Sequence, residues 1–180
     1  MKLLIALDGS KFAEEVLGPA AELAARCGAE VHLLEVVKES ESRPTRFISP
    51  TAGRVLGAGY EWPRGVPMRS PEHPIEMGVL VETAAQAEER TCCEAREYLD
   101  GVARRYFHGV AKTKVMLGEN PAEEILDYIE LEKVDLVAMA THGRTGLAKL
   151  LLGSVAAKLL RARAAPLFLV RPQKLPEWEA

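Results

Sequence analysis

The chain has few cysteines: three in 180 residues, at positions 27, 92 and 93. Adjacent residues on a helix point in different directions, so Cys92 and Cys93 do not suit a disulfide or half of a zinc site. A free cysteine otherwise behaves as a small apolar side chain. We therefore expect three packed or partly exposed thiols without chemistry, and no metal site.

Long apolar runs and an excess of basic residues are also missing. The first apolar run, 3–7, stops at Asp8 and is too short for a signal peptide, and no segment approaches the roughly 20 apolar residues of a membrane span. The 26 acidic and 23 basic residues leave a net charge of -3, which provides no positive field for a nucleic-acid backbone. We expect a cytoplasmic protein that binds neither membranes nor nucleic acid.

What the chain does contain is an alternation of short apolar runs with helical spacing. The runs 2–7, 31–37, 110–117, 134–140 and 166–170 predict five strands, and the patterns over 16–27, 85–106, 121–129 and 154–163 predict four helices. Such strand-helix-strand steps form right-handed parallel crossovers. We predict an α/β fold with one doubly wound domain, whose five-stranded parallel sheet has strand order 3-2-1-4-5 and helices on both faces.

Residues 38–81 interrupt this rhythm with six of the eleven prolines and several glycines. Loops of this length are uncommon and usually functional or mobile. We interpret the segment as a loop insertion after the second strand, either an excursion from the fold or a partner surface. The predicted domain spans 1–172, and residues 173–180 form a C-terminal tail.

Two segments lie where sheets of this kind bind ligands, at the carboxyl ends of the strands. One is the turn at Asp8 after the first strand; the other is the loop that follows the fourth strand and reaches a helix start. Glycines permit close approach of the backbone and helix N–H groups favour anions, so Gly143, Gly153 and Ser154 are predicted to bind phosphate. The same glycines also suit turns and helix caps. Neither the P-loop motif nor the dinucleotide-binding motif is present, which argues against a P-loop NTPase and a dinucleotide-dependent dehydrogenase.

Three polar side chains accompany these loops. Asp8 can accept hydrogen bonds from ribose hydroxyls, although aspartate in this place also serves turns and helix caps. Arg144 suits the screening of phosphate charge or simple surface exposure. His142 has no assignable carboxylate or nucleophile as a partner, so we predict no catalytic residue.

The segment ATHGRTGLAKLLLGSV, residues 140–155, resembles the signature of universal stress proteins. The similarity covers essentially the whole chain, since 4–10, 118–125 and 165–170 resemble the family's first strand and turn, its third-helix entry and its last strand. ATP-binding members carry G-x2-G-x9-G-[ST]. Gly143 and Gly153 with Ser154 match this motif, but Ala140 replaces its first glycine, where a methyl group either crowds the ribose or leaves the site usable.

The resemblance implies a regulatory module of the stress response that binds ATP, with or without Mg²⁺, and is not a dedicated enzyme, although slow ATP hydrolysis stays open. It places Asp8 and the backbone of Val36 at the nucleoside, Ala140 near the ribose, and the two glycines and Ser154 at the phosphates.

The family resemblance also implies a homodimer. The last strand, 166–170, is apolar and expected at a sheet edge, so pairing with a second copy would cover it. The alternative function, favoured by Ala140, is a homodimeric interaction protein without nucleotide. An electron-transfer or adenylyl-transfer enzyme on a related sheet is a third reading for which the sequence provides no motif.

Overall fold

The computed structural model describes residues 1–39, 46–49, 78–141 and 152–171 of the chain. These residues form two compact units, one of 1–42 and 90–180 and the other of 43–89. Each unit is described by itself.

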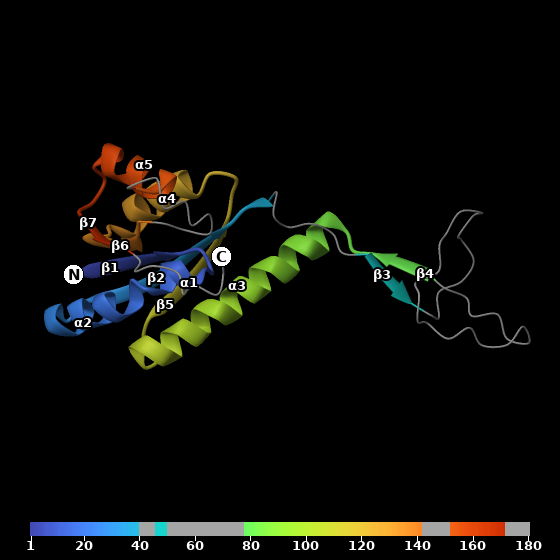
Figure 1. The fold of residues 1–180 in the computed structure, drawn as a ribbon, viewed down its shortest axis with the longest axis horizontal. Coiled ribbons are helices and arrows are strands. Elements are labelled where there is room, and N and C mark those ends of the chain that lie inside the picture. The colour runs from blue at the N-terminus through green and yellow to red at the C-terminus, as the bar shows by residue number, and fades with distance from the viewer. Residues whose placement is uncertain (40–45, 50–77, 142–151, 172–180) are drawn as a thin grey trace, which may run out of the picture. The chain divides into compact units, whose positions relative to one another are not determined.

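The larger unit contains a five-stranded parallel sheet (Figure 1). Its strands are β1 (Lys2–Leu7), β2 (Glu30–Val37), β5 (Lys112–Leu117), β6 (Leu136–Ala140) and β7 (Leu167–Val170). They lie in the order β5-β2-β1-β6-β7, and every neighbouring pair is parallel. In chain order within this sheet that is 3-2-1-4-5, so the predicted fold class is confirmed.

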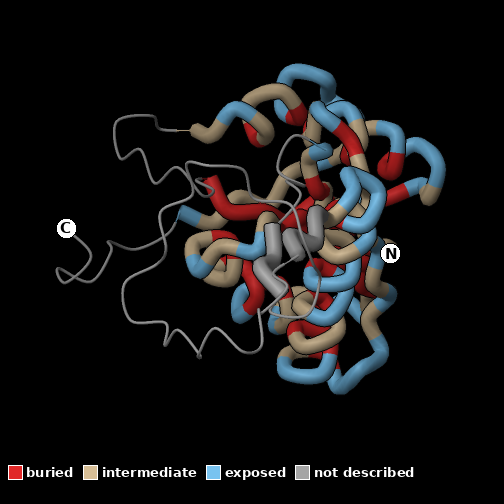
Figure 2. The backbone as a smooth tube through the Cα atoms, turned by 90° about the vertical axis from the view of Figure 1, so that its right-hand side faces the viewer, coloured by how far each residue is buried: buried red, intermediate tan, exposed pale blue. Residues whose placement is uncertain are grey.

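Helices cover both faces of this sheet. They are α1 (Lys11–Glu14), α2 (Leu17–Cys27), α3 (Ala84–Phe107), of which residues 90–107 belong to this unit, α4 (Pro121–Glu132) and α5 (Ser154–Ala162). The first three pack on the face that carries Leu3 and Leu33, whereas α4 and α5 pack on the face that carries Leu4 and Leu34. The central strands are buried on both faces (Figure 2), which explains why their sequences are mostly apolar, with His32 and Glu35 of β2 as buried exceptions.

Residues at the starts of the helices explain where these helices begin. The Ser10 hydroxyl accepts a hydrogen bond from the Ala13 amide at 3.1 Å, as its position before α1 predicts. The helical pattern around Pro19 divides into α1 and α2, and the proline occupies the first turn of α2, where no amide donor is required. Asn120 precedes α4, but its side chain makes no capping hydrogen bond.

The smaller unit differs from the expected loop. Strands β3 (Arg46–Ser49) and β4 (Gly78–Val81) form an antiparallel pair in which Phe47 lies opposite Leu80. Both are four-residue runs with β-branched or aromatic members, which favour strands but are too short to stand out among prolines and glycines. Most of the 38–81 insertion lies outside the described residues, and the boundaries at 172 and 173 stay predictions.

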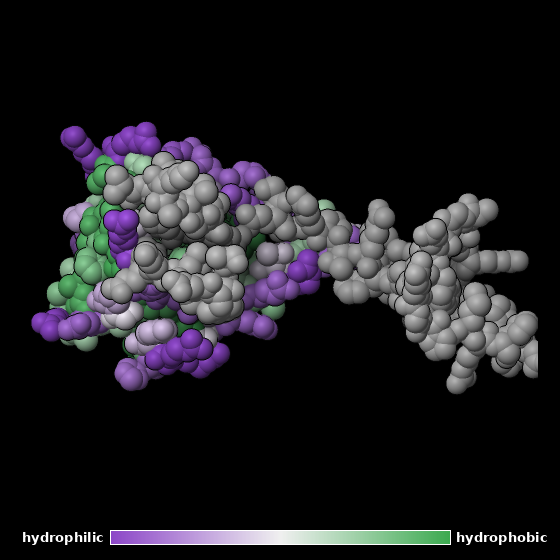
Figure 3. Space-filling model, in the orientation of Figure 1, coloured by the Kyte–Doolittle hydropathy of each residue, from purple (hydrophilic) through white to green (hydrophobic). Residues whose placement is uncertain are grey.

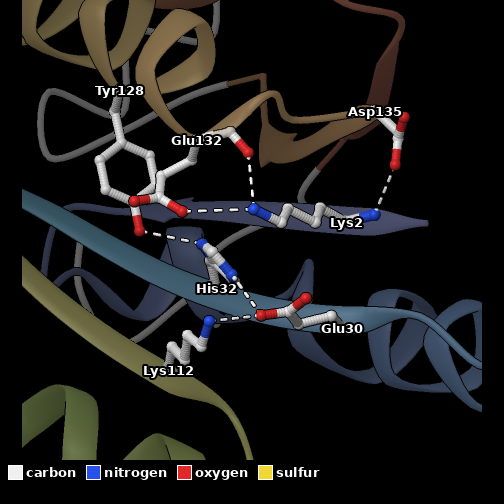
Figure 4. A network of polar contacts seen from close by, with 7 residues as sticks. All are labelled: Lys2, Glu30, His32, Lys112, Tyr128, Glu132 and Asp135. Atoms are coloured by element: carbon white, nitrogen blue, oxygen red, sulfur yellow. Dashed lines mark hydrogen bonds and ion pairs between the residues drawn. The ribbon is translucent and has the colours of Figure 1, made fainter.

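A polar network joins the amino ends of the strands (Figure 4). The carboxylate of Glu30 pairs with the Lys112 ammonium at 2.5 Å and contacts His32 Nε2 at 3.2 Å. His32 is buried in β2, and its Nδ1 lies 2.9 Å from the Tyr128 hydroxyl of α4. Hydrogen bonds from Lys112 and His32 lower the pKa of Glu30 from 4.5 to about 2. The network therefore ties β2 to β5 on one side and to α4 on the other.

Candidate functional site

A cavity of about 410 Å³ lies at the carboxyl ends of β1, β2 and β6, the edge of the sheet opposite the polar network. The chain leaves β1 toward β2 on one side and reaches β6 on the other, so this is the place where the strand order reverses. The starts of α4 and α5 complete its wall. Parallel sheets of this class bind their ligands at such a crevice.

Most of the residues predicted from the sequence meet in this cavity. Its wall contains Asp8 from the end of β1, Val36 from β2, Ala140 from the end of β6, and Gly153 and Ser154 from the start of α5. The other two predicted site residues, at positions 143 and 144, lie outside the described residues, as does the histidine at position 142. The fold therefore gathers residues from three separate parts of the sequence, while their roles toward a ligand stay predictions.

Asp8 shapes the turn that follows β1. Its Oδ1 accepts hydrogen bonds from the Ser10 amide at 3.0 Å and from the Ser10 hydroxyl at 2.6 Å, and Gly9 between them has a positive φ of 74°. The turn role considered for this aspartate is thus real. A carboxylate has about four acceptor sites, so a turn role and the acceptance of hydrogen bonds from ribose hydroxyls are compatible in one side chain.

Gly153 is required by close packing. Its amide donates a hydrogen bond to the Thr141 carbonyl oxygen at 2.6 Å, and a Cβ at this position would lie 2.8 Å from that same oxygen. Because its φ of -63° is open to any residue, the glycine is needed for space and not for backbone freedom. The contact holds the start of α5 against the end of β6.

The first turn of α5 has the properties of an anion site. The N-cap, Gly153, makes no side-chain capping bond, and the first turn contains no acidic residue. Ser154, Val155 and Ala156 of this turn all line the cavity. The amide groups and the positive end of the helix dipole therefore border the same space, where they favour a negatively charged group.

Apolar side chains form another part of the wall. Leu34 contributes from β2, Ile125 from α4 and Met139 from β6, and all three belong to the core cluster on this face of the sheet. An apolar wall with a few converging polar groups is typical of small-molecule sites. It suits a flat ring system bound beside a charged or hydroxylated portion.

Sequence reasoning missed several residues of this wall. They include Lys38 after β2, Glu119 and Asn120 before α4, and Lys158 on α5. Two signals could have found them: residues 118–121 follow a parallel strand and so reach the same edge of the sheet, and Lys158 follows Ser154 by four residues, which places both on one helix face.

The charges on the described part of the wall cancel. Asp8 and Glu119 contribute carboxylates, and Lys38 and Lys158 contribute ammonium groups. This described part therefore attracts an anionic ligand through local groups and not through an excess of positive charge.

In the described ranges, no cluster of three or more histidine, cysteine, aspartate or glutamate side chains is arranged to hold a metal ion. None of the helices in the described part of the chain is long and apolar enough to cross a membrane.

Comparison with protein families gives a match over nearly the whole chain. Residues 1–56 and 66–171 match the model of the universal stress protein family. Universal stress protein MJ0531 from Methanocaldococcus jannaschii is 30% identical over 173 residues, which cover 96% of this chain and 83% of that protein. Universal stress protein YxiE from Bacillus subtilis is 26% identical, with coverage of 94% and 98%.

Solved structures share the fold. The structure of MJ0577, also from M. jannaschii, has a TM-score of 0.67 at 24% identity and covers 97% of both chains. A universal stress protein solved in complex with cAMP has a TM-score of 0.53 at 15% identity, with coverage of 95% and 96%. These similarities extend over the parallel sheet and its helices.

Proposed function

The chain belongs to the universal stress protein family, and we propose that its cavity binds an adenine nucleotide, ATP with or without Mg²⁺, in a regulatory module of the stress response. The proposal rests on one observation: Asp8, the end of β2 and the first turn of α5 all line the same cavity. A family member of the same fold has been solved with cAMP, itself an adenine nucleotide, which supports this ligand class.

Each part of the nucleotide has a matching part of the wall. The apolar side chains of Leu34, Ile125 and Met139 suit the base, the Asp8 carboxylate suits the ribose hydroxyls, and the amides around Ser154 suit phosphate. No residue is assigned a catalytic role, and slow hydrolysis of bound ATP is left open. The proposed protein is a nucleotide-dependent regulator in the cytoplasm.

Ala140 supports a second candidate function, that of a homodimeric interaction protein without a nucleotide. It stands where the ATP-binding pattern has a glycine, and its methyl group belongs to the cavity wall, with 8% of the residue exposed. If the methyl group crowds the ribose, no nucleotide binds in the cavity, and the protein acts through its outer surface by binding partners.

Titration of the purified full-length chain with ATP separates the two functions. We expect stoichiometric heat in calorimetry, and adenine nucleotide among the small molecules that denaturation releases from freshly purified protein, detected by mass spectrometry. GTP at the same concentration is the control for general polyphosphate binding. A protein that is isolated empty and gives no heat with ATP or ADP would favour the interaction protein.

We also propose that the chain forms a homodimer through β7. Among the described strands, β7 pairs with β6 alone and ends the sheet, and its four residues, all apolar, are half-buried. Hydrophobic surface gathers on the side of the unit where β7 lies (Figure 3). An apolar edge strand with one open side is a template for pairing with a second copy.

A proline at Leu169 tests this assembly. The carbonyls of Pro166 and Val170 accept hydrogen bonds from the amides of Val137 in β6 and Thr141 just after it. In the parallel ladder the alternate residue Leu169 therefore directs its own amide to the open edge. We expect Leu169→Pro to be monomeric in sedimentation at micromolar concentration, because it removes an outward donor without touching the β6 ladder.

Leu169→Ala is the matched control for that experiment, since it shortens the same side chain and keeps the amide. We expect Leu169→Ala to be dimeric, as the wild type is. A monomeric wild type, or a proline variant that stays dimeric, would count against assembly through β7.

A further inference from the structure

Lys158 stands on the cavity wall but is held by a carboxylate that does not belong to the wall. Its ammonium lies 2.6 Å from Oε1 of Glu123 on α4. The cavity-lining residues include Lys158 and the neighbours of Glu123, among them Ala122 and Ile125, but not Glu123 itself. The ion pair thus joins α4 to α5 beside the cavity.

The position of Lys158 relates it to the phosphate end of the proposed site. It follows Ser154 by one helical turn, and residues four apart lie on the same helix face. A lysine side chain is long and flexible and ends in a point charge with three donors, so its ammonium can turn toward a phosphate near Ser154 without any change in the helix.

The ion pair is suited to exchange. The side chains of Lys158 and Glu123 are 40% and 60% exposed, and exposed pairs contribute little to stability because water screens their attraction. The remaining charges of the described wall give no net attraction for an anion once Lys158 is neutralised by Glu123, since Asp8 and Glu119 outnumber Lys38. Within the described wall, a bound polyphosphate therefore gains a positive contact by drawing the Lys158 ammonium away from Glu123.

We propose that Lys158 is a phosphate-binding residue and that Glu123 competes with the phosphates for it, so that affinity rises with the number of phosphates. This inference rests on the proposed nucleotide site and adds to it a charge switch between α4 and α5. With adenosine the Lys158–Glu123 pair stays closed, and with ATP it opens and releases Glu123 at the start of α4.

The test compares adenosine, AMP, ADP and ATP by calorimetry with the wild type, Lys158→Gln and Glu123→Gln. We expect Lys158→Gln to weaken ATP binding about tenfold, the loss of one charge-assisted contact, and to change adenosine binding by less than about twofold. Glu123→Gln should have the opposite sign and tighten ATP binding about threefold, because it removes both the competitor and a negative charge. The double variant should behave like Lys158→Gln.

The matched controls are Arg26→Gln and Glu22→Gln, which break another exposed pair of 2.6 Å on α2, away from the cavity. Neither should alter ATP affinity. If Lys158→Gln and Glu123→Gln weaken ATP binding equally, or weaken adenosine as much as ATP, the pair only joins two helices and the inference is overturned. If neither variant alters ATP binding, the inference about Lys158 is overturned while the proposed nucleotide site stands. If the wild type binds no adenine nucleotide, both the inference and the proposed function are overturned.

Discussion

Gly153→Trp is expected to abolish nucleotide binding, with affinity for ATP at least about 100-fold lower, equivalent to about 3 kcal/mol. An indole at this position occupies the cavity next to the first turn of α5, where the phosphates are proposed to bind. Its Cβ also meets the Thr141 carbonyl, because even a methyl group would lie 2.8 Å from that oxygen. The start of α5 must move away from β6, and the amides that face the cavity lose their positions.

Two companions make this result interpretable. Gly18→Trp places the same side chain on α2 at an exposed glycine with open space around it, so it should bind ATP as the wild type does. Gly153→Ala adds only the contact with Thr141 and should fall between the wild type and the tryptophan variant. Circular dichroism verifies that each variant is folded. Unchanged ATP affinity in a folded Gly153→Trp protein would place the nucleotide elsewhere.

The fold was largely predictable because its strands are simple. Five short apolar runs separated by helical spacing admit few architectures once crossovers must be right-handed, and the observed sheet has the expected order. The antiparallel pair β3 and β4 was missed because four-residue strands carry little periodicity. The buried place of His32 was missed for a different reason: its Nδ1 has a partner 96 positions away, which no local pattern contains.

The candidate site was predictable where it depends on strand ends and glycines. Asp8 and Gly153 follow from the rule that ligands bind at the carboxyl edge of the sheet. Lys158 and Glu119 were missed because their signals are only positional: one lies a helical turn after Ser154 and the other follows a parallel strand, and their side-chain types alone do not indicate a site. The close approach of Thr141 to Gly153 likewise depends on packing between β6 and α5 and could not be read from the loop between them.

Tyr128→Phe is expected to lower the free energy of unfolding by about 1–3 kcal/mol, a large fraction of a typical domain's stability. The variant removes only the hydroxyl that lies 2.9 Å from His32 Nδ1. Because His32 is 1% exposed, water cannot easily replace this partner, and a buried polar nitrogen without a partner costs its full desolvation. Urea unfolding measures the change, and Tyr106→Phe, which alters a half-buried ring on the other face, should stay within about 0.5 kcal/mol of the wild type.

A second substitution distinguishes the lost hydrogen bond from lost packing. In Tyr128→Phe combined with His32→Leu both partners are apolar, so the double variant should be more stable than the sum of the single losses predicts, with a coupling of about 1 kcal/mol. Additive losses would mean that the two side chains contribute independently. The coupling matters for the proposed site because Tyr128 shares a helix face with Ile125, and His32 shares a strand face with Leu34. One hydrogen bond thus joins α4 to β2, and residues of both elements also line the cavity.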